Sequence, residues 1–549
     1  MRQELVASVV IIGAGPVGLS LAMDLVWRGL GVTIVESRHA GEPPNVKCNH
    51  VAARTMEIFR RLGIVAAVRN AGLPADYPND VAYRTAFLGR EMSRIRIPSR
   101  AERYTATDGP DTWWPTPEPP HRINQIYLEP VLFEQAVRAG VRIVNRAEYQ
   151  GFEQDEEGVR VTARDLDGGG VLGISCRYLI GCDGGRSQVR RDIGATLEGD
   201  PVIQRVQSTF IRAPELLPLL RAQGGTPAWG SFALNPRRSA NIFAIDGRET
   251  WLVHAYMKDE ETDFDAIDRD RGIRDILGVG PDFRYDIISR EDWVGRRLLA
   301  DKFRDRRVFL CGDAAHLWVP FAGYGMNAGI ADAMNLSWLL AAHLRGWAPA
   351  AILDAHIAER RPITEQVSHF AMNHALHVAW QRRAVPPEVE APGPEGDRVR
   401  AAMGRRAYEL NVQQYCCAGL NFGYFYDASP IIAYDGETPP AYSMADYTPS
   451  TVPGARLPHL WLADGRSLYD ALGPHYTLLR FDPAVDVAPL MQAAAAQRVP
   501  LDLLDVAAPD AAALYRRKLV LARPDQHVAW RGDAPPRDPA ALIARIRGA

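Results

Sequence analysis

The stretch SVVIIGAGPVGLSLAMDLVWRGLGVTIVESR, residues 8–38, decides the fold of the first part of the chain. Its apolar run Val9–Ile12 is typical of a buried parallel strand. Residues 13–18, GAGPVG, match the pattern G-x-G-x-x-G, and an apolar pattern of helical spacing follows them. Val32–Val35 indicates a second strand, which ends at Glu36. This order of strand, glycine turn, helix, strand and acidic residue predicts a dinucleotide-binding βαβ unit.

Each part of this unit has a physical role in holding a dinucleotide. Gly13 permits the tight turn, Gly15 lets backbone amides approach a pyrophosphate, and Gly18 allows the helix to pack closely on the strand. The helix N-terminus offers N–H groups and partial positive charge to the phosphates. Glu36 can accept both hydroxyls of an adenosine ribose, and its charge disfavours a 2′-phosphate. The expected contacts are Gly13, Gly15, Pro16, Val17, Gly18, Glu36 and Ser37.

Composition restricts the class of protein. The 549 residues are enough for two or three domains, and a hydrophobic content of 47% is ample for large cores. The formal charge of −3 is spread along the chain, which disfavours a nucleic-acid partner. None of the six cysteines lies in a C-x-x-C pair, so we expect reduced thiols and a cytoplasmic location. The early first strand leaves no room for a signal peptide, and no apolar run reaches the ~20 residues of a membrane span.

A second signature lies at residues 177–190, RYLIGCDGGRSQVR. It indicates an apolar strand, a turn at Asp183 and Gly184, and a helix that Ser187 can cap. Short strands are expected before it, at 141–144, 149–153 and 159–164.

A third signature, RVFLCGDAAH, occupies residues 307–316 and continues as PFAGYGMN at 320–327. Asp313 stands at the carboxyl end of a strand, where its carboxylate can bind a ligand hydroxyl or simply form a turn. Gly323 and Gly325 free the backbone to point N–H groups at a ring or an oxyanion, just before a helix that runs to about residue 344.

The rest of the chain divides by pattern. Residues 71–120 are irregular and rich in proline and aromatic residues, and 201–292 change to strand-like segments such as 241–245 and 250–256, which predict an antiparallel sheet. The expected domains are a discontinuous first domain at 1–80, 121–200 and 293–395, a substrate domain at 81–120 and 201–292, a connection at 396–453 and a C-terminal domain at 454–549.

Three signatures in this order resemble the class A flavoprotein monooxygenases, the aromatic hydroxylases of the para-hydroxybenzoate and phenol hydroxylase type. The resemblance covers about residues 5–395. It implies an α/β fold with a Rossmann-like FAD-binding domain, an inserted antiparallel-sheet substrate domain and tightly bound, non-covalent FAD. The tail resembles the thioredoxin-like C-terminal domain of the phenol hydroxylase branch, with the expected order strand, helix, strand, helix, strand, helix, two paired strands and a last helix. Without a C-x-x-C pair, a redox role of the tail is not expected.

The resemblance also implies roles for single residues. Glu36 would bind the adenosine ribose, and Lys47, where many members carry arginine, would keep the charge near the pyrophosphate without the fork geometry of arginine. Lys47 could equally be a solvated surface lysine. Gln125 would bind the flavin side of the pyrophosphate, while Asp183 and Gly184 would shape the turn near FAD and the pyridine nucleotide. The remaining flavin contacts would be Asp313 on the ribityl chain, Gly323, Gly325, Met326 and Asn327 at the N1–C2=O edge, and Pro320 beside C4a and the substrate hydroxyl.

The implied reaction has two halves: NADPH or NADH reduces FAD by hydride transfer, and O2 then forms a flavin C4a-hydroperoxide that hydroxylates a phenol. His50, His254 and Tyr256 are candidate bases by their position in the chain, and each also has a purely structural interpretation. His316 is interpreted as a packing residue. Alternatives are a Baeyer–Villiger or dehydrogenating flavoenzyme of the same fold, or a non-catalytic FAD protein.

A small phenol of a catabolic pathway is favoured over a large polyketide as the substrate. No metal motif is present, no membrane is expected as a partner, and a homodimer is the default oligomer. The aromatic residues that could line the substrate pocket are Tyr83, Trp113, Trp114, Phe232, Phe243, Trp318, Phe321 and Tyr324.

Overall fold

The first signature forms the centre of a six-stranded sheet in the computed structural model, which describes residues 3–508 and 511–549. Val9–Ile12 is the fully buried strand β2, the helix α1 spans Pro16–Trp27, and β3 spans Val32–Val35. The second and third signatures supply β10 (Tyr178–Gly181) and β18 (Val308–Leu310). The strand order is β17-β18-β10-β2-β3-β6, with β17 at Arg304–Asp305 and β6 at Arg142–Val144.

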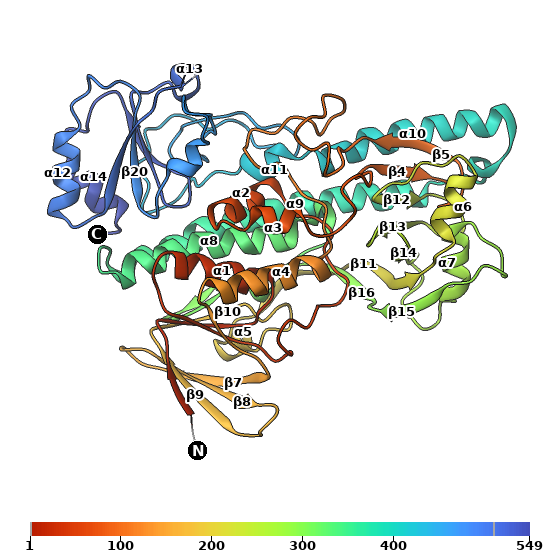
Figure 1. The fold of residues 1–549 in the computed structure, drawn as a ribbon, viewed down its shortest axis with the longest axis horizontal. Helices are drawn as coiled ribbons and strands as arrows, with labels where there is room; N and C mark the ends of the chain where they lie inside the picture. Colours follow the sequence, from red (N-terminus) through yellow and green to blue (C-terminus); the bar gives the residue numbers. More distant parts are fainter. Residues whose placement is uncertain (1–2, 509–510) are drawn as a thin grey trace.

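The three signatures are therefore neighbours in space. β10 pairs in parallel with both β2 and β18, so all three strands end at the same edge of the sheet. Helices α4 (Gln125–Arg138) and α8 (Tyr324–Leu344) pack against α1 above this sheet (Figure 1). The smaller helices of this part are α2 (Ala53–Arg61), α3 (Val65–Arg69), α5 (Gln188–Asp192) and the 3-10 turns Gly312–Ala314, Phe321–Gly323 and Ala350–Leu353.

A four-stranded sheet lies beside the first one, at the lower end of the molecule in Figure 1. Its order is β1-β9-β8-β7, with β1 at Gln3–Val6, β9 at Val171–Cys176, β8 at Val159–Asp165 and β7 at Ala147–Gln154. The sequence predicts β7 and β8 but gives no sign of β1 and β9. β9 carries Gly173 and is mostly half-buried, so it lacks a clear alternation of apolar and polar residues.

The part of the chain expected to be the substrate domain contains a nine-stranded sheet, ordered β19-β16-β11-β14-β13-β12-β4-β5 with β15 paired to β11. Every pairing is antiparallel except that of β12 with β4. The strands are β4 (Val81–Arg84), β5 (Glu91–Ile95), β11 (Leu197–Arg212), β12 (Gly230–Ala233), β13 (Ala240–Ala244), β14 (Thr250–Tyr256), β15 (Asp286–Arg290), β16 (Trp293–Ala300) and β19 (His316–Leu317), with helices α6 (Leu216–Ala222) and α7 (Arg269–Leu277). The sheet thus continues past residue 292 and leads straight into the third signature.

Long helices cover the junction between the two sheets. α9 (Asp354–Arg383) follows α8, and α10 (Gly393–Tyr415) packs against β5 (Figure 1). The segment 396–453, expected to be a connection, does more than connect, because Ala407 and Tyr415 belong to the buried core of the substrate domain. The short elements here are a 3-10 turn at Pro387–Glu390 and α11 at Ala418–Phe422.

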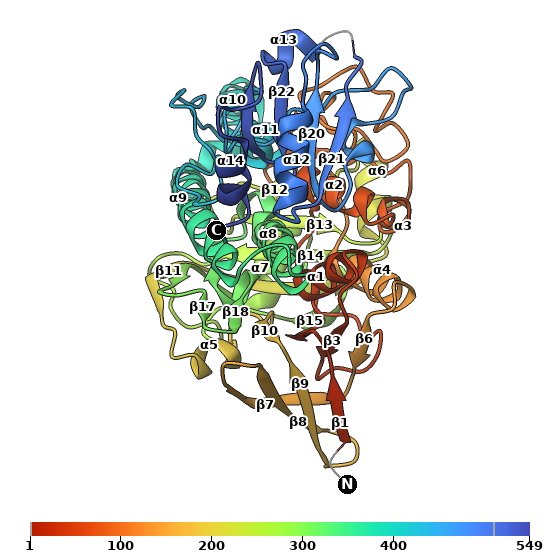
Figure 2. The same ribbon diagram turned by 90° about the vertical axis from the view of Figure 1, so that its left-hand side faces the viewer.

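The C-terminal domain has a thioredoxin-like sheet of order β21-β20-β22-β23 (Figure 2). Its elements are β20 (Tyr476–Arg480), α12 (Ala488–Ala496), β21 (Leu501–Asp505), α13 (Ala511–Tyr515), β22 (Leu519–Ala522), β23 (Val528–Gly532) and α14 (Pro539–Ile546). The first expected strand is wrong, because residues 454–475 form only isolated bridges and a 3-10 turn at Leu468–Ala471.

Buried ion pairs fasten this domain to the rest of the chain. Arg523 donates to both carboxylate oxygens of Glu359 on α9, at 2.5 and 2.7 Å, and Arg456 pairs with Glu57 on α2. Because all four side chains are buried, separating the domains would leave uncompensated charges. The domain is thus an integral part of the fold.

Candidate active site

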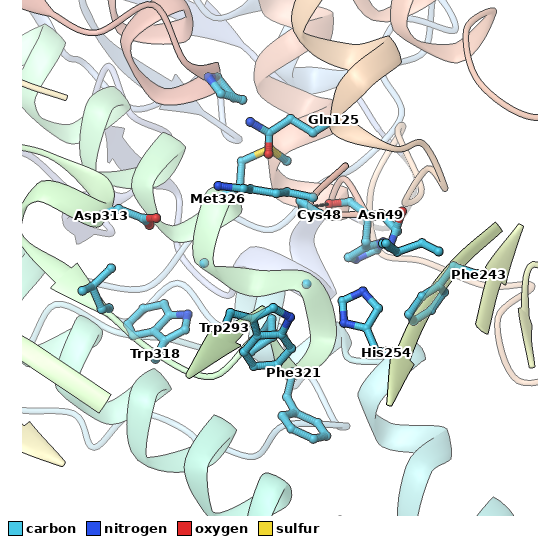
Figure 3. A pocket seen from close by; sticks show the side chains of 18 of the residues that line it. Cys48, Asn49, Gln125, Phe243, His254, Trp293, Asp313, Trp318, Phe321 and Met326 are labelled. Carbon is cyan, nitrogen blue, oxygen red and sulfur yellow. Dashed lines mark hydrogen bonds between the residues drawn. The ribbon is translucent and has the colours of Figure 1, made fainter. Parts of the chain in front are cut away.

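Two adjoining cavities lie at the common edge of β2, β10 and β18. We call the larger, of about 860 Å³, the polar cavity, and the smaller, of about 410 Å³, the aromatic cavity (Figure 3). They share Gly15, Lys47, Gln125 and Cys182 in their walls and therefore adjoin.

The glycines of the first signature shape the entrance to these cavities. Gly13 has a φ of +104°, and a Cβ there would lie 2.5 Å from the carbonyl oxygen of Cys182. A Cβ on Gly18 would lie 2.1 Å from the carbonyl oxygen of Gly13. Gly15 differs, because no protein atom lies within 4 Å of its Cβ position and it lines both cavities. Its missing side chain leaves room for a ligand at the start of α1, where Pro16 and Val17 also line the aromatic cavity.

Glu36 lies at the end of β3 in the wall of the polar cavity, with Ser37 beside it. Its Oε2 accepts a hydrogen bond from the Ala14 N–H at 2.7 Å, and its Oε1 accepts one from the Arg38 N–H at 2.9 Å. Burial works to raise the pKa of Glu36, but the hydrogen bonds from Arg38 and Ala14 outweigh it and lower that pKa. The carboxylate is therefore charged and fixed in place.

Asp313 and Lys47 are the charged groups of the third signature and the preceding loop. The Asp313 carboxylate faces the aromatic cavity (Figure 3), and it has no hydrogen-bond partner within residues 3–508 and 511–549. Lys47 lines both cavities and forms an ion pair of 2.6 Å with Glu291, which links it to the substrate domain.

The turn of the second signature is held by its own aspartate. The Asp183 carboxylate accepts hydrogen bonds from the Ser187 hydroxyl at 2.6 Å and from the Gln188 N–H at 2.7 Å. Ser187 in turn accepts one from the Arg190 N–H, which confirms the predicted cap of α5. Asp183 lines the polar cavity and Gly184 the aromatic cavity, so this turn lies at their junction.

The loop before α8 is tied to the loop that carries His50. Pro320, Gly323, Gly325 and Met326 line the aromatic cavity, whereas Asn327 does not. The Asn327 side chain accepts from the Ala52 N–H at 2.8 Å and donates to the carbonyls of His50 at 3.2 Å and Gly323 at 2.6 Å. Its role in this structure is therefore to hold two cavity-lining loops together.

The aromatic walls come from distant parts of the chain. Of the aromatic residues named from the sequence, four line the cavity and four do not; the first group is Phe232, Phe243, Trp318 and Phe321, and the second is Tyr83, Trp113, Trp114 and Tyr324. Trp113 is exposed, which makes it unsuitable for a pocket. The sequence misses Arg122, Trp229, Asn241, Trp293, Gln414 and Tyr415, which also line the cavity. No local pattern marks them, because only the folding of β12, β13, β16 and α10 around one space brings them together.

The three candidate bases occupy the aromatic cavity, and their environments differ. Burial and the charge of Arg122 hold the pKa of His50 well below its usual value, and burial lowers the pKa of His254 to about 4. Burial raises the pKa of Tyr256, whose hydroxyl accepts a hydrogen bond of 2.8 Å from Asn241. At neutral pH both histidines are therefore neutral and weakly basic, and Tyr256 keeps its proton.

His316 is not part of the acid–base set. Its Nε2 lies 2.6 Å from Asp332, and its ring stacks on Trp318 with centroids 4.8 Å apart. It lines the aromatic cavity beside Trp318, and its contacts are those of the packing residue that the sequence interpretation proposes.

His254 provides a pH-dependent prediction. Its ring lies between Phe243 and Trp293, with centroids 5.8 Å from each (Figure 3). Because its pKa is lower in the folded protein, stability should fall as pH drops from the unfolded pKa of about 6.5 toward 4. We expect the unfolding free energy of the native protein to fall by about 2 kcal/mol more than that of His254→Gln between pH 8 and pH 5, in urea titrations. The exposed His377→Gln variant is the control, and an equal pH response of native protein and His254→Gln would contradict the assignment.

Two protein-family models match the chain. An FAD-binding domain matches residues 6–371, and an aromatic-ring hydroxylase C-terminal domain matches residues 450–549. The chain belongs to the FAD-dependent aromatic-ring hydroxylases. An FAD-dependent monooxygenase, apdD, from Emericella nidulans is 30% identical, over 96% of this chain and 88% of its own. Phenol 2-monooxygenase from a Pseudomonas species is 29% identical, over 97% of this chain and 91% of its own. A structure of RebC with bound 7-carboxy-K252c shares 34% identity and a TM-score of 0.89, covering 99% of both chains.

The residues of this hydroxylase fit FAD. The space at Gly15 and the fixed carboxylate of Glu36 suit a pyrophosphate and a ribose, and the unpartnered Asp313 suits a hydroxyl-bearing chain between the two cavities. No group of three or more potential metal-ligating side chains occurs in the described part of the chain, and no helix there is long and apolar enough to cross a membrane.

Proposed function

We propose that this protein is a single-component monooxygenase that uses NAD(P)H and O2 to hydroxylate a phenolic ring bound in the aromatic cavity. The observation that carries the proposal is that the two cavities adjoin, so that the polar cavity with Gly15 and Glu36 in its wall meets a cavity lined by aromatic side chains. A dinucleotide cofactor held in the polar cavity would reach past Asp313 to Gly325 and Met326, and an aromatic ring in the aromatic cavity would meet its reactive part there.

Bound FAD would supply the redox chemistry, by accepting a hydride and activating O2 for transfer of one oxygen atom to the ring. The chain itself binds and orients the reactants. Gly15 and the start of α1 would receive the phosphates, and Glu36 the ribose. Backbone N–H groups at Gly325 and Met326, in the first turn of the 21-residue helix α8, would stabilise negative charge at the cofactor edge.

The walls of the aromatic cavity keep water away from the reacting ring. Phe243, Trp293 and Trp318 provide flat apolar surfaces on which an aromatic substrate can stack (Figure 3). The chain is similar to phenol 2-monooxygenase, whose name includes a phenol, and to RebC, whose structure holds 7-carboxy-K252c. Both similarities support an aromatic substrate here.

The hydride donor would bind on the open side of the polar cavity. Arg186 and Arg191 line this cavity beside Asp183 and can attract the phosphates of a pyridine nucleotide. Two G-x-G-x-x-G matches occur in the described residues, but the one at 168–173 leads into strand β9, and only 13–18 follows a strand and opens a helix. FAD would use that unit, so donor binding would be transient.

The test is stopped-flow reduction of the yellow holoenzyme by NADH and by NADPH, with phenol, 4-nitrophenol and 1-naphthol. An oxygen pulse and product analysis follow each reduction. We expect at least one phenol to speed flavin reduction and to yield a dihydroxylated product. The proposal would be overturned if no phenol changed the rate of flavin reduction and the oxygen pulse gave only peroxide. Oxygenation of ketones instead would favour the Baeyer–Villiger alternative.

A further inference from the structure

Arg122 places an unneutralised positive charge in the wall of the aromatic cavity. Its side chain is 4% exposed, and it lies just before α4. No carboxylate lies within 4.0 Å of it in the described parts of the chain. Other buried arginines, such as Arg456 and Arg523, pair with glutamates. Because an unpaired buried charge is costly, Arg122 calls for an anion that the chain does not supply.

The neighbours of Arg122 do not provide that anion. Its guanidinium lies 4.8 Å from the ring centroid of Trp229 and 5.6 Å from that of Tyr415, and these contacts offset part of the cost. One terminal nitrogen is buried without a hydrogen-bond partner. Asp111, the nearest acid, already binds Arg103 and the Trp114 indole N–H. Burial raises the pKa values of Tyr415, Cys416 and Cys417, so all three stay neutral.

The other terminal nitrogen of Arg122 fixes the state of His50. Because the guanidinium can only donate, Nδ1 of His50 must accept this hydrogen bond, and the ring proton lies on Nε2. His50 is 4% exposed and lines the aromatic cavity, and its Nε2 has no partner within the described residues. The ring is held from behind, since a Cβ on Gly323 would lie 2.9 Å from the Cβ of His50. His50 is thus a fixed donor backed by a positive charge.

We propose that the substrate binds in the aromatic cavity through an anionic oxygen on its ring system, a phenolate or a carboxylate, which receives the Nε2–H of His50 and the charge of Arg122. This inference rests on the proposed function, because the anion belongs to the molecule that is hydroxylated. A phenolate ring is more nucleophilic than a phenol, so binding the ionised form would remove the need for a protein base. That fits His254 and Tyr256, neither of which is a strong base at neutral pH.

Matched pairs of ligands test this inference on the oxidised holoenzyme. The probes are 4-nitrophenol and 4-nitroaniline, which compare a phenolate with a neutral isostere, and 2-naphthoate and 2-naphthamide, which do the same for a carboxylate. Equilibrium dialysis at a pH where both acids are ionised gives the dissociation constants. We expect at least one anion to bind about tenfold more tightly than its neutral partner, and the absorbance of bound 4-nitrophenol to show ionisation at a lower pH than in solution.

Variants assign the preference to residues. Arg122→Gln should abolish it, Arg122→Lys should keep part of it, and His50→Leu should weaken it. If Arg122→Gln fails to retain FAD, the ionisation of bound 4-nitrophenol is measured in His50→Leu instead. Its ionisation should need a higher pH there than in the native protein, and an unchanged pH would overturn the inference. Equal binding within both pairs, no binding of either anion, or a preference that survives in Arg122→Gln would overturn the inference. Failure of this inference can be told apart from failure of the proposed function. If the protein oxygenates a neutral aromatic compound and shows no preference for anions, the function holds and the inference fails.

Discussion

A protein in which Gly15 is replaced by valine is expected to fold normally and to lose FAD. No protein atom lies within 4 Å of the Gly15 Cβ position, and its φ of −76° suits any residue. The added side chain would enter the space shared by the two cavities. We expect the free energy of unfolding of the apoprotein to change by about 1 kcal/mol or less, and the FAD affinity to fall by about a hundredfold or more. Urea unfolding and flavin fluorescence titration measure the two effects.

Gly18→Ala is the matched control for this experiment. A Cβ there would lie 2.1 Å from the carbonyl oxygen of Gly13, which is backbone and cannot move aside. This variant should lose stability as well as FAD. Gly15→Val therefore reports the effect of filling the ligand space, and Gly18→Ala reports the effect of disrupting the turn. Full FAD retention by Gly15→Val would show that the cofactor does not pass beside this glycine.

Replacing Asn327 with leucine is expected to disorganise both loops of the aromatic cavity. The side chain is 3% exposed and makes three hydrogen bonds to backbone groups of Ala52, His50 and Gly323. Leucine would leave the Ala52 N–H and the Gly323 carbonyl without these partners, at about 1–3 kcal/mol for each that stays buried, and the His50 carbonyl with only the Cys48 thiol. We expect the unfolding free energy to fall by about 3 kcal/mol or more and FAD binding to weaken. Thermal unfolding and flavin retention on gel filtration report the two effects.

The control for Asn327→Leu is the same substitution at an exposed asparagine. Asn373 lies on the surface of α9, and Asn373→Leu should leave both stability and flavin content nearly unchanged. An Asn327→Leu protein as stable as Asn373→Leu would mean that the two loops hold their places without the asparagine.

The sequence predicts the FAD-binding part of the fold well because its determinants are local. The run Val9–Ile12, the glycine turn and Glu36 all lie within one βαβ unit, residues 9–36, and each has its own physical role. The same holds for the turn at Asp183, the cap at Ser187 and the helix after Gly323. Because such elements depend on neighbouring residues, they occur in the structure close to where the sequence predicts them.

The substrate cavity is harder to predict because its residues meet only through long-range contacts. Arg122 comes from a loop, Trp229 from the bend just before β12, and Tyr415 from the end of a long helix. Nothing in their neighbouring residues distinguishes them from ordinary core residues. Asn327 shows the reverse case, because the resemblance places it beside the flavin while the folded chain uses its side chain to join two loops.

The most direct test of the central claim is to follow oxygen from isotopically labelled O2 into the product. Holoenzyme, NAD(P)H and the tightest-binding phenol of the panel are mixed under ¹⁸O2, and the product is analysed by mass spectrometry. The account expects one labelled atom, placed as a new hydroxyl on the ring. Consumption of NAD(P)H with an unlabelled product, or with peroxide alone, would contradict it.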